Sequence, residues 1–335
     1  DARATEQAKR IRQYALKGSA AQGPASALAK LLWYQDQQIT QRAEHALHQS
    51  DWVSAQLCGR FGVSDTNNCL KLGYDPINNE WPQWLDKIKV PRQLLPRVVK
   101  PGTVMGTIKF ALTERFNFPI TTHIIAGTTD STASFIATGA SQPGEAVTSL
   151  GSTLVLKVLA DEPVFEPNYG VYSQPINDQW LVGGASNTGG AVLLKFFSQE
   201  QLDELTPQLK PAVSTNLNYY PLFSQGERFP VNDPELKSNT MPRPQDDVEF
   251  FQGLLEGIAS IEQKGYERLA ELGAPFPSKI YTTGGGANNE AWTTIRSLIL
   301  GSPIIKSEQT EAAYGSALLA RQGSINLTSN LKSFQ

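Results

Sequence analysis

Asp130 and the Gly151-Ser152 pair are the residues of this chain whose types and spacing favour chemistry. Asp130 opens a stretch with helical periodicity, and Gly151-Ser152 lies between two stretches that alternate as β-strands do. A carboxylate at the start of a helix can take a proton from an alcohol, and a tight two-residue turn presents backbone N–H groups and hydroxyls to a phosphate. Together they predict a phosphotransferase in which Asp130 is the base and the turn holds the phosphate.

Each of these features also has a purely structural interpretation. An Asp at a helix start is most often only a cap, and Gly-Ser between two strands is most often only a turn. A later glycine run favours function, because Gly284-Gly285-Gly286 lies between a predicted strand (279–283) and a predicted helix (290–300). Glycines at that place let the backbone approach a ligand that a Cβ would exclude.

Two residues after the glycine run could read a nucleotide. Asn289 offers an amide to a purine or ribose edge, and Trp292 offers a flat face for stacking. The structural alternative is a flexible connector with Trp292 in the core. A second glycine-bearing stretch, 184–190, also runs into a predicted helix (191–197). The N-terminus of that helix is a further candidate for binding a nucleotide or phosphate, although the sequence signal by itself is weak.

These residues require an α/β scaffold. Apolar periodicity predicts a long helix over 250–272, and the order strand, glycine loop, helix, strand, helix over 279–321 places a ligand at the carboxyl end of a strand. We read 198–245 as a polar excursion over the surface. Further helices are expected at 1–17, twice within 25–49, at 50–58, 109–116 and 130–137, and strands at 94–108, 124–126, 147–158, 170–173 and 180–183.

Composition narrows the function classes. The 335 residues are 40% hydrophobic, with a net charge of -3 and no basic block, so the sequence does not point to nucleic acid or an anionic membrane. It has no apolar run of 18 residues, and its two cysteines, Cys58 and Cys69, are expected to be free thiols in the cytoplasm. His45 and His48 lack a third ligand, so we expect no protein-held metal. P-loop, GxGxxG, HExxH and GxSxG motifs are absent.

Six motifs follow one another along the chain: AGTTDS (126–131), TSLGSTL (148–154), GGASNTGG (183–190), EGIAS (256–260), TGGGANNEAW (283–292) and AAYGSALLA (312–320). With these motifs the chain resembles the FGGY carbohydrate kinases over essentially its whole length. This family has the actin-like ATPase (ribonuclease H-like) fold, in which two domains flank a nucleotide and sugar cleft. The resemblance implies an N-terminal sugar-binding domain over 1–138 and a C-terminal nucleotide-binding domain over 139–335, and it is nearest to the ribulose and xylulose kinases, in particular a D-ribulose branch of cyanobacteria and plants.

The resemblance also implies roles for single residues. Asp130 is the expected general base, and Ser131 and Asp1 are further candidates at the sugar. ATP with Mg²⁺ is the expected cofactor pair, the metal being held mostly by phosphates and water. The expected nucleotide contacts are Gly151, Ser152 and Thr153 in the hairpin, Gly190 near the phosphates or ribose, Gly285 and Gly286 through backbone N–H groups, and Asn289 and Trp292 at the adenine.

The chain departs from the family pattern at its start. The family begins with a β-hairpin that carries a first phosphate loop, and nothing here matches it, so we expect the first domain to be incomplete. We also expect this chain alone to hold nucleotide but to turn over poorly, which a comparison with an N-terminally extended chain would test.

Two alternatives to a ketopentose kinase stay open. One is a non-catalytic actin-like protein that uses nucleotide to switch a partner surface, and the other is a hydrolase using Asp130 or Ser131, which the lack of a partnered histidine disfavours. The sequence does not set the sugar, since xylulose or another polyol is compatible with it. The oligomeric state is equally hidden, and a homodimer is one candidate.

Overall fold

The computed structural model of the protein describes residues 2–332, so the predicted sugar contact of Asp1 lies outside the described residues. The chain separates into two compact units. Unit 1 holds the residues up to Ala137, together with Gln174–Asn177 and the residues from Glu311 on, and unit 2 holds Thr138–Ser173 and Asp178–Thr310. The predicted domain boundary between residues 138 and 139 stays a prediction. The predicted division assigns the last two segments of unit 1 to the second domain.

Unit 1 is mainly helical, with two small sheets. Strand β1 (Val63–Asp65) pairs in parallel with β2 (Arg97–Val99), and β3 (Val104–Thr107) pairs antiparallel with β4 (His123–Ile125). The apolar faces of the first helices form a core around Ile11, Leu28, Leu32 and Leu85. The helices of unit 1 are α1 (Thr5–Arg12), α2 (Ala27–Asp36), α3 (Gln49–Cys58), α4 (Thr66–Cys69), α5 (Trp84–Lys87), α6 (Phe110–Phe116), α7 (Asp130–Ala137) and α11 (Ala312–Lys332).

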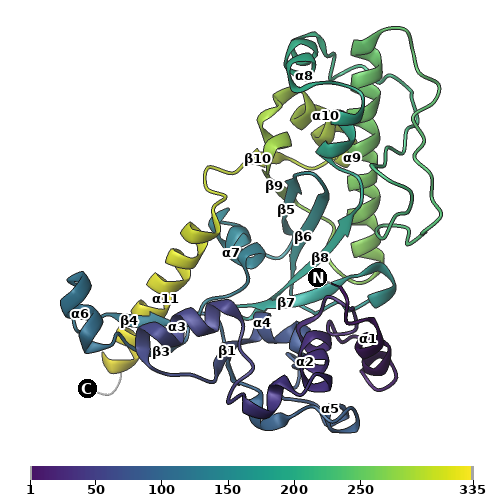
Figure 1. Ribbon diagram of the computed structural model, residues 1–335. Coiled ribbons are helices and arrows are strands. Elements are labelled where there is room, and N and C mark those ends of the chain that lie inside the picture. Colours follow the sequence, from purple (N-terminus) through teal and green to yellow (C-terminus); the bar gives the residue numbers. More distant parts are fainter. Residues whose placement is uncertain (1, 333–335) are drawn as a thin grey trace. The chain divides into compact units, whose positions relative to one another are not determined.

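Helix α7, which begins at Asp130, lies directly against α11 (Figure 1). A Cβ added to Gly315 of α11 would lie 1.8 Å from the carbonyl oxygen of Ala133 in α7. The missing side chain therefore lets the two helices meet at backbone distance. This contact fixes α7, the helix that carries the proposed base.

Unit 2 is built on a sheet of order β10-β9-β5-β6-β8-β7, in which only the first two residues of β7, Tyr172 and Ser173, belong to unit 2. Strands β10, β9 and β5 are parallel, and β6 runs antiparallel to both β5 and β8. The long helix α9 (Asp247–Glu271) packs on β6 and β8 and beside α10 (Glu290–Leu300) (Figure 1). The strands are β5 (Glu145–Leu150), β6 (Leu154–Ala160), β7 (Tyr172–Ile176), β8 (Gln179–Ser186), β9 (Lys279–Thr283) and β10 (Ile304–Lys306).

The carboxyl ends of β5 and β9 lie side by side, because Ser149 is paired with Thr283. The chain then leaves β5 through Gly151 and leaves β9 through Gly284. The two glycine-containing segments that the sequence singles out are therefore neighbours at one edge of the sheet, as expected for a ligand site at the ends of parallel strands.

Several predicted elements differ in length or type. The hairpin turn has three residues, 151–153, because Leu150 pairs with Leu154, so the two-residue turn was wrong. The predicted helix over 191–197 is a 3-10 helix, η5 (Gly190–Lys195). The second helix within 25–49 shrinks to η1 (Ile39–Arg42), the first helix ends at Arg12, and the last extends to Lys332.

The segment 198–245 was predicted to run over the surface, but part of it is buried. It contains a capped helix, α8 (Gln199–Leu205), and its apolar residues Tyr219, Leu222 and Phe229 are 4%, 1% and 0% exposed. These side chains belong to the core of unit 2 or lie beside it, because they cover apolar surface of the sheet and of α9 that water would otherwise reach.

Cys58 and Cys69 are both free thiols. Within the described part of the chain, no helix is long and apolar enough to cross a membrane. The same residues contain no group of three or more His, Cys, Asp or Glu side chains placed to hold a metal ion.

Candidate functional site

The turn between β5 and β6 offers backbone donors. The N–H of Gly151 bonds the carbonyl of Thr153 at 3.2 Å, which closes the turn. Among the described residues, no acceptor receives the N–H groups of Ser152 and Thr153, and both residues are exposed. Two consecutive backbone donors at an exposed turn form the kind of concave nest that binds anions.

The segment that follows β8 grips this turn through main-chain hydrogen bonds. The N–H of Gly190 donates to the carbonyl of Gly151 at 2.8 Å, and the N–H of Leu154 donates to the carbonyl of Thr188 at 2.7 Å. Gly189 lies between them with φ of 148°, and a Cβ there would lie 2.6 Å from the carbonyl oxygen of Ser152. Only glycine permits this approach. Gly190 thus supports the turn, and its N–H is already bonded to the Gly151 carbonyl.

The glycine run after β9 meets the same turn from the other side. Gly284 has φ of 83°, and a Cβ there would lie 2.6 Å from the carbonyl oxygen of Leu150. A Cβ on Gly286 would lie 2.7 Å from the Trp292 ring, whereas one on Gly285 would meet nothing within 4 Å. Packing therefore explains Gly284 and Gly286, and Gly285 is the glycine that faces open space.

These segments enclose one pocket within unit 2, of about 520 Å³. Helix α8, which the sequence analysis missed, adds the polar side chains Gln199 and Asp203 to the lining, and Thr206 follows directly after this helix. The predicted residues that line the pocket are Gly151, Ser152, Gly190, Gly285, Gly286, Asn289 and Trp292. Thr153 belongs to the turn but is not part of the lining.

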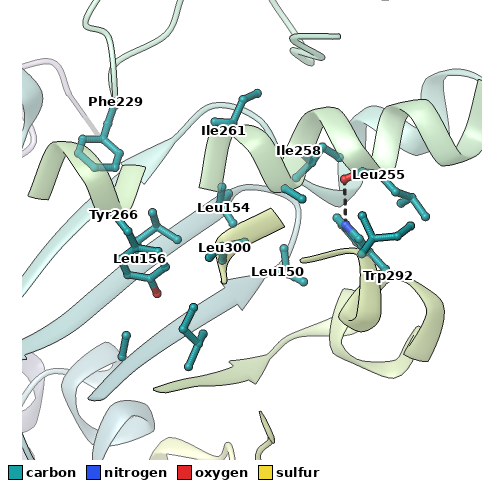
Figure 2. Close-up of a cluster of buried hydrophobic side chains, with 14 of the residues drawn as sticks. Leu150, Leu154, Leu156, Phe229, Leu255, Ile258, Ile261, Tyr266, Trp292 and Leu300 are labelled. Carbon is teal, nitrogen blue, oxygen red and sulfur yellow. Dashed lines mark hydrogen bonds between the residues drawn. The ribbon is translucent and has the colours of Figure 1, made fainter. Parts of the chain in front are cut away.

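Asn289 and Trp292 both form hydrogen bonds within unit 2. The Asn289 side chain accepts the N–H of Trp292 at 2.9 Å as the N-cap of α10, and it donates to Thr206 Oγ1 at 3.2 Å. Trp292 is 2% exposed, and its indole N–H donates to the carbonyl of Leu255 at 3.2 Å (Figure 2). The ring thus lies in the core against Leu150, as the structural alternative has it, and a contact of Trp292 with the adenine stays a prediction.

A fully buried polar network anchors the strands beneath the pocket. Arg296 of α10 and Glu262 of α9 are both 0% exposed and form two short hydrogen bonds, 2.6 Å from Nε and 2.7 Å from Nη2. Arg296 Nη1 also donates to Thr282 Oγ1 of β9 at 2.8 Å, and Thr148 of β5 donates to Glu262 at 2.6 Å. The network fixes α9, α10, β5 and β9 to one another.

Asp130 and Ser131 belong to unit 1. Asp130 is the first residue of α7 and is exposed, and its Oδ1 accepts the N–H of Ser131 at 2.6 Å. Its carboxylate is open to a solute and could receive a proton from an alcohol.

Two side chains that the sequence analysis did not single out hold the residues just before Asp130. Asn67 Nδ2 donates to Thr128 Oγ1 at 2.9 Å, and Gln174 Nε2 donates to Thr129 Oγ1 at 3.1 Å. Asn67 is 3% exposed, and its Oδ1 has no hydrogen-bond partner within the described part of the chain. Nothing in the local sequence marks these residues, because their partners are 61 and 45 residues away.

The pocket suits an adenine nucleotide in size and chemistry. Its volume lies within the range of about 300 to 1,000 Å³ that small-molecule sites usually have. The turn supplies N–H donors for phosphate, and the apolar Leu193, Leu202 and Phe251 line the pocket with surface suited to a base. Of the described lining residues only Asp203 carries a carboxylate, so a Mg²⁺ ion arriving with the nucleotide would take its ligands mainly from phosphate and water.

Comparison with known proteins identifies the family. The profile of the C-terminal domain of the FGGY family of carbohydrate kinases matches residues 146–322. The chain belongs to the FGGY family of carbohydrate kinases. The match contains the turn, the Gly189 segment, the glycine run and α10, so the whole pocket of unit 2 lies in the part that FGGY proteins share.

Solved FGGY kinases show the same fold. A xylulose kinase from Brucella ovis has a TM-score of 0.84 at 21% identity and covers 97% of this chain and 70% of its own. A glycerol kinase from Plasmodium falciparum, solved with ADP, has a TM-score of 0.82 at 17% identity and covers 97% and 69%. The fold is therefore the mixed α/β, actin-like ATPase fold that the resemblance implied.

Curated relatives are distant and longer. L-fuculokinase of Escherichia coli (strain K12) is 22% identical over 87% of this chain and 63% of its own length. Xylulose kinase of Bacillus subtilis (strain 168) is 22% identical over 89% and 62%. The chain thus spans less than two thirds of the length of these relatives. The D-ribulose branch stays a prediction.

Proposed function

We propose that the protein is an ATP-dependent carbohydrate kinase that phosphorylates a ketopentose. The observation that carries this proposal is the unit 2 pocket, in which an N–H-bearing turn and a glycine run meet at the carboxyl ends of two parallel strands. Positioned backbone donors and an apolar wall are what a nucleotide site needs, and phosphoryl transfer depends mainly on positioning and charge stabilisation.

In the proposed reaction Asp130 is the general base. Its carboxylate takes the proton of a sugar hydroxyl, the hydroxyl oxygen forms a bond to the γ-phosphorus of ATP, and the bond from that phosphorus to the β-γ bridging oxygen breaks to leave ADP. The N–H groups of Ser152 and Thr153 would hold the phosphates, and Mg²⁺ bound with the ATP would supply positive charge that offsets theirs. Asn67 and Gln174 hold the two threonines that precede the base.

The proposed sugar is D-ribulose, with D-xylulose or another polyol as the alternative. Xylulose kinases among both the relatives and the solved structures favour a ketopentose. The choice between pentoses depends on a few hydrogen bonds to hydroxyl groups, so it needs a direct screen of ketopentoses and polyols for ATP consumption. A cytoplasmic location and a homodimer stay predictions.

Substituting Asp130 tests the proposal. Asp130→Asn and Asp130→Ala should each lower ketopentose-dependent ADP formation by about 10²- to 10⁴-fold, because the proton loses its acceptor. The affinity for ADP, measured by calorimetry, should stay unchanged. Asp75→Asn is the matched control, since Asp75 also accepts a backbone N–H in unit 1 and is not part of the site.

The same experiment separates a kinase from a non-catalytic nucleotide switch. The unit 2 pocket is complete within one unit, which a switch would also need. A chain that binds ADP but forms none with any ketopentose or polyol, in wild-type and variants alike, would support the switch. Equal turnover in wild-type and both Asp130 variants would refute the assigned base.

A further inference from the structure

Glu227 is a buried carboxylate of unit 2 that forms no ion pair with any described residue. It is 2% exposed and accepts hydrogen bonds from Ser186 Oγ at 2.5 Å and from the N–H of Asn187 at 2.8 Å. The N–H of Arg228 donates to it at 3.0 Å. A buried charge is costly unless such donors surround it, so Glu227 ties the end of β8 firmly to the 226–228 segment.

The residues that Glu227 holds lead directly to the phosphate-binding turn. Ser186 Oγ accepts the N–H of Thr188 at 3.1 Å, and the Thr188 hydroxyl donates to the carbonyl of Pro221 at 2.6 Å. The carbonyl of Thr188 in turn accepts the N–H of Leu154, the first residue after the turn, at 2.7 Å. One continuous chain of hydrogen bonds therefore connects Glu227 to the turn at 151–153.

We propose that Glu227 is a positioning residue for the turn that holds the nucleotide phosphates. It acts through Ser186, Asn187 and Thr188, and it does not line the pocket itself. This inference rests on the proposed function, since it takes the turn to be the phosphate site. A carboxylate suits the position because it accepts on both oxygens, whereas a Gln side chain would direct an NH₂ group at one set of donors.

Glu256 provides a matched control in the same unit. It is 9% exposed and accepts hydrogen bonds from the Thr215 hydroxyl at 2.7 Å and from Gln252 Nε2 at 2.9 Å. Glu256 thus also ties the 198–245 segment, through Thr215, to helix α9 of unit 2. Neither Glu256 nor these partners line the pocket, and none bonds the turn.

The test compares Glu227→Gln and Glu227→Ala with Glu256→Gln and Glu256→Ala in the full chain. Amide hydrogen exchange of the ligand-free proteins is followed at Leu154 and Gly190, whose N–H groups report the grip on the turn. We expect both Glu227 variants to exchange faster there, on the order of tenfold, relative to amides in the core of α9. Both Glu256 variants should leave that ratio unchanged. ADP affinity should fall by a similar factor in the Glu227 variants alone.

The outcomes separate this inference from the proposed function. An unchanged exchange ratio in Glu227→Gln and Glu227→Ala, or the same change in the Glu256 variants, would overturn it. If Glu227→Ala does not fold, Glu227→Gln decides by the same ratio. A wild-type chain that binds no ADP would contradict the proposed function, while the exchange ratio would still decide whether Glu227 positions the turn.

Discussion

The two candidate regions are held in place by different kinds of hydrogen bond, from the main chain in unit 2 and from side chains in unit 1. In unit 2, main-chain hydrogen bonds from Leu154 and Gly190 hold the turn, and glycines allow the segments to approach. In unit 1, the side-chain amides of Asn67 and Gln174 hold the threonines that precede Asp130.

Burial of charge differs in the same way. Unit 2 carries the Arg296–Glu262 pair with both side chains 0% exposed, and its charges neutralise each other. In unit 1, Asp65 is 4% exposed and forms no ion pair with a described residue, and it accepts the N–H groups of Asn67 and Asn68. The Arg296–Glu262 pair thus keeps two opposite charges buried together in unit 2, whereas the charge of Asp65 in unit 1 changes with pH.

Breaking the buried pair should have the largest effect on stability. Arg296→Met leaves Glu262 as an uncompensated buried charge, so the free energy of unfolding of unit 2 should fall by about 3–5 kcal/mol. Arg268→Met removes a partly exposed pair with Glu271 at the end of α9, the helix that carries Glu262, together with the Arg268 hydrogen bond to the Pro230 carbonyl, and should cost only about 1–2 kcal/mol. Denaturant unfolding followed by hydrogen exchange, which resolves the two units, measures both. Comparable losses in the two variants would show that the pair does not stabilise unit 2 as described.

Asp65 should give unit 1 a distinct pH dependence. Burial raises the pKa of Asp65 from 3.8 to about 6, so the folded state binds this proton more tightly than the unfolded state does. The stability of unit 1 should therefore fall by up to about 3 kcal/mol as the pH rises from about 4 to about 6, and then level off.

Asp65→Asn should remove this fall, which urea unfolding at a series of pH values would show. Asp75→Asn is the control, because Asp75 accepts the same three kinds of hydrogen bond at a more exposed position. It should leave the slope in place. A wild-type slope that survives Asp65→Asn would assign the proton to another group.

Gly189→Ala tests whether the backbone contact shapes the unit 2 site. The added methyl overlaps the Ser152 carbonyl and the Thr153 backbone, so the turn must move, at a cost of about 1–3 kcal/mol. ADP affinity should fall with it. Gly170→Ala also has positive φ but meets nothing within 4 Å, and it should leave ADP affinity unchanged. Calorimetric titration with ADP measures both variants. An ADP affinity of Gly189→Ala equal to that of the wild type would show that the contact at Gly189 does not set the conformation of the turn.

Asn289→Ala should have the smallest effect. Loss of the cap on α10 should cost about 1 kcal/mol, as should Ser198→Ala at the cap of α8. ADP affinity should change by less than about tenfold, because the Asn289 amide already bonds Trp292 and Thr206. A larger loss of affinity would support the predicted role of Asn289 at the adenine.

The sequence allowed the elements around the unit 2 pocket to be predicted closely. Strand β9 and helix α10 have the predicted bounds, because a β-rich run and a helical period flank three glycines. Helix α8 was missed although Ser198 and Gln201 form a capping box that the sequence displays.

The supporting side chains could not be found in this way. Glu227, Asn67 and Gln174 contact segments about 40 to 60 residues distant, and no local pattern encodes such partners. Trp292 shows the same limit. A tryptophan in the first turn of a helix suits a ligand or a core equally, and only tertiary packing places it in the core.

Mapping ADP binding by ¹H–¹⁵N NMR tests the central claim most directly. If the turn and the glycine run hold the nucleotide, the amides of Ser152, Thr153 and Gly285 should shift together and saturate with one affinity. Amides of α2 in unit 1 should not follow that titration. Binding that leaves the three amides unmoved, or no binding at millimolar ADP, would contradict the assignment of this pocket.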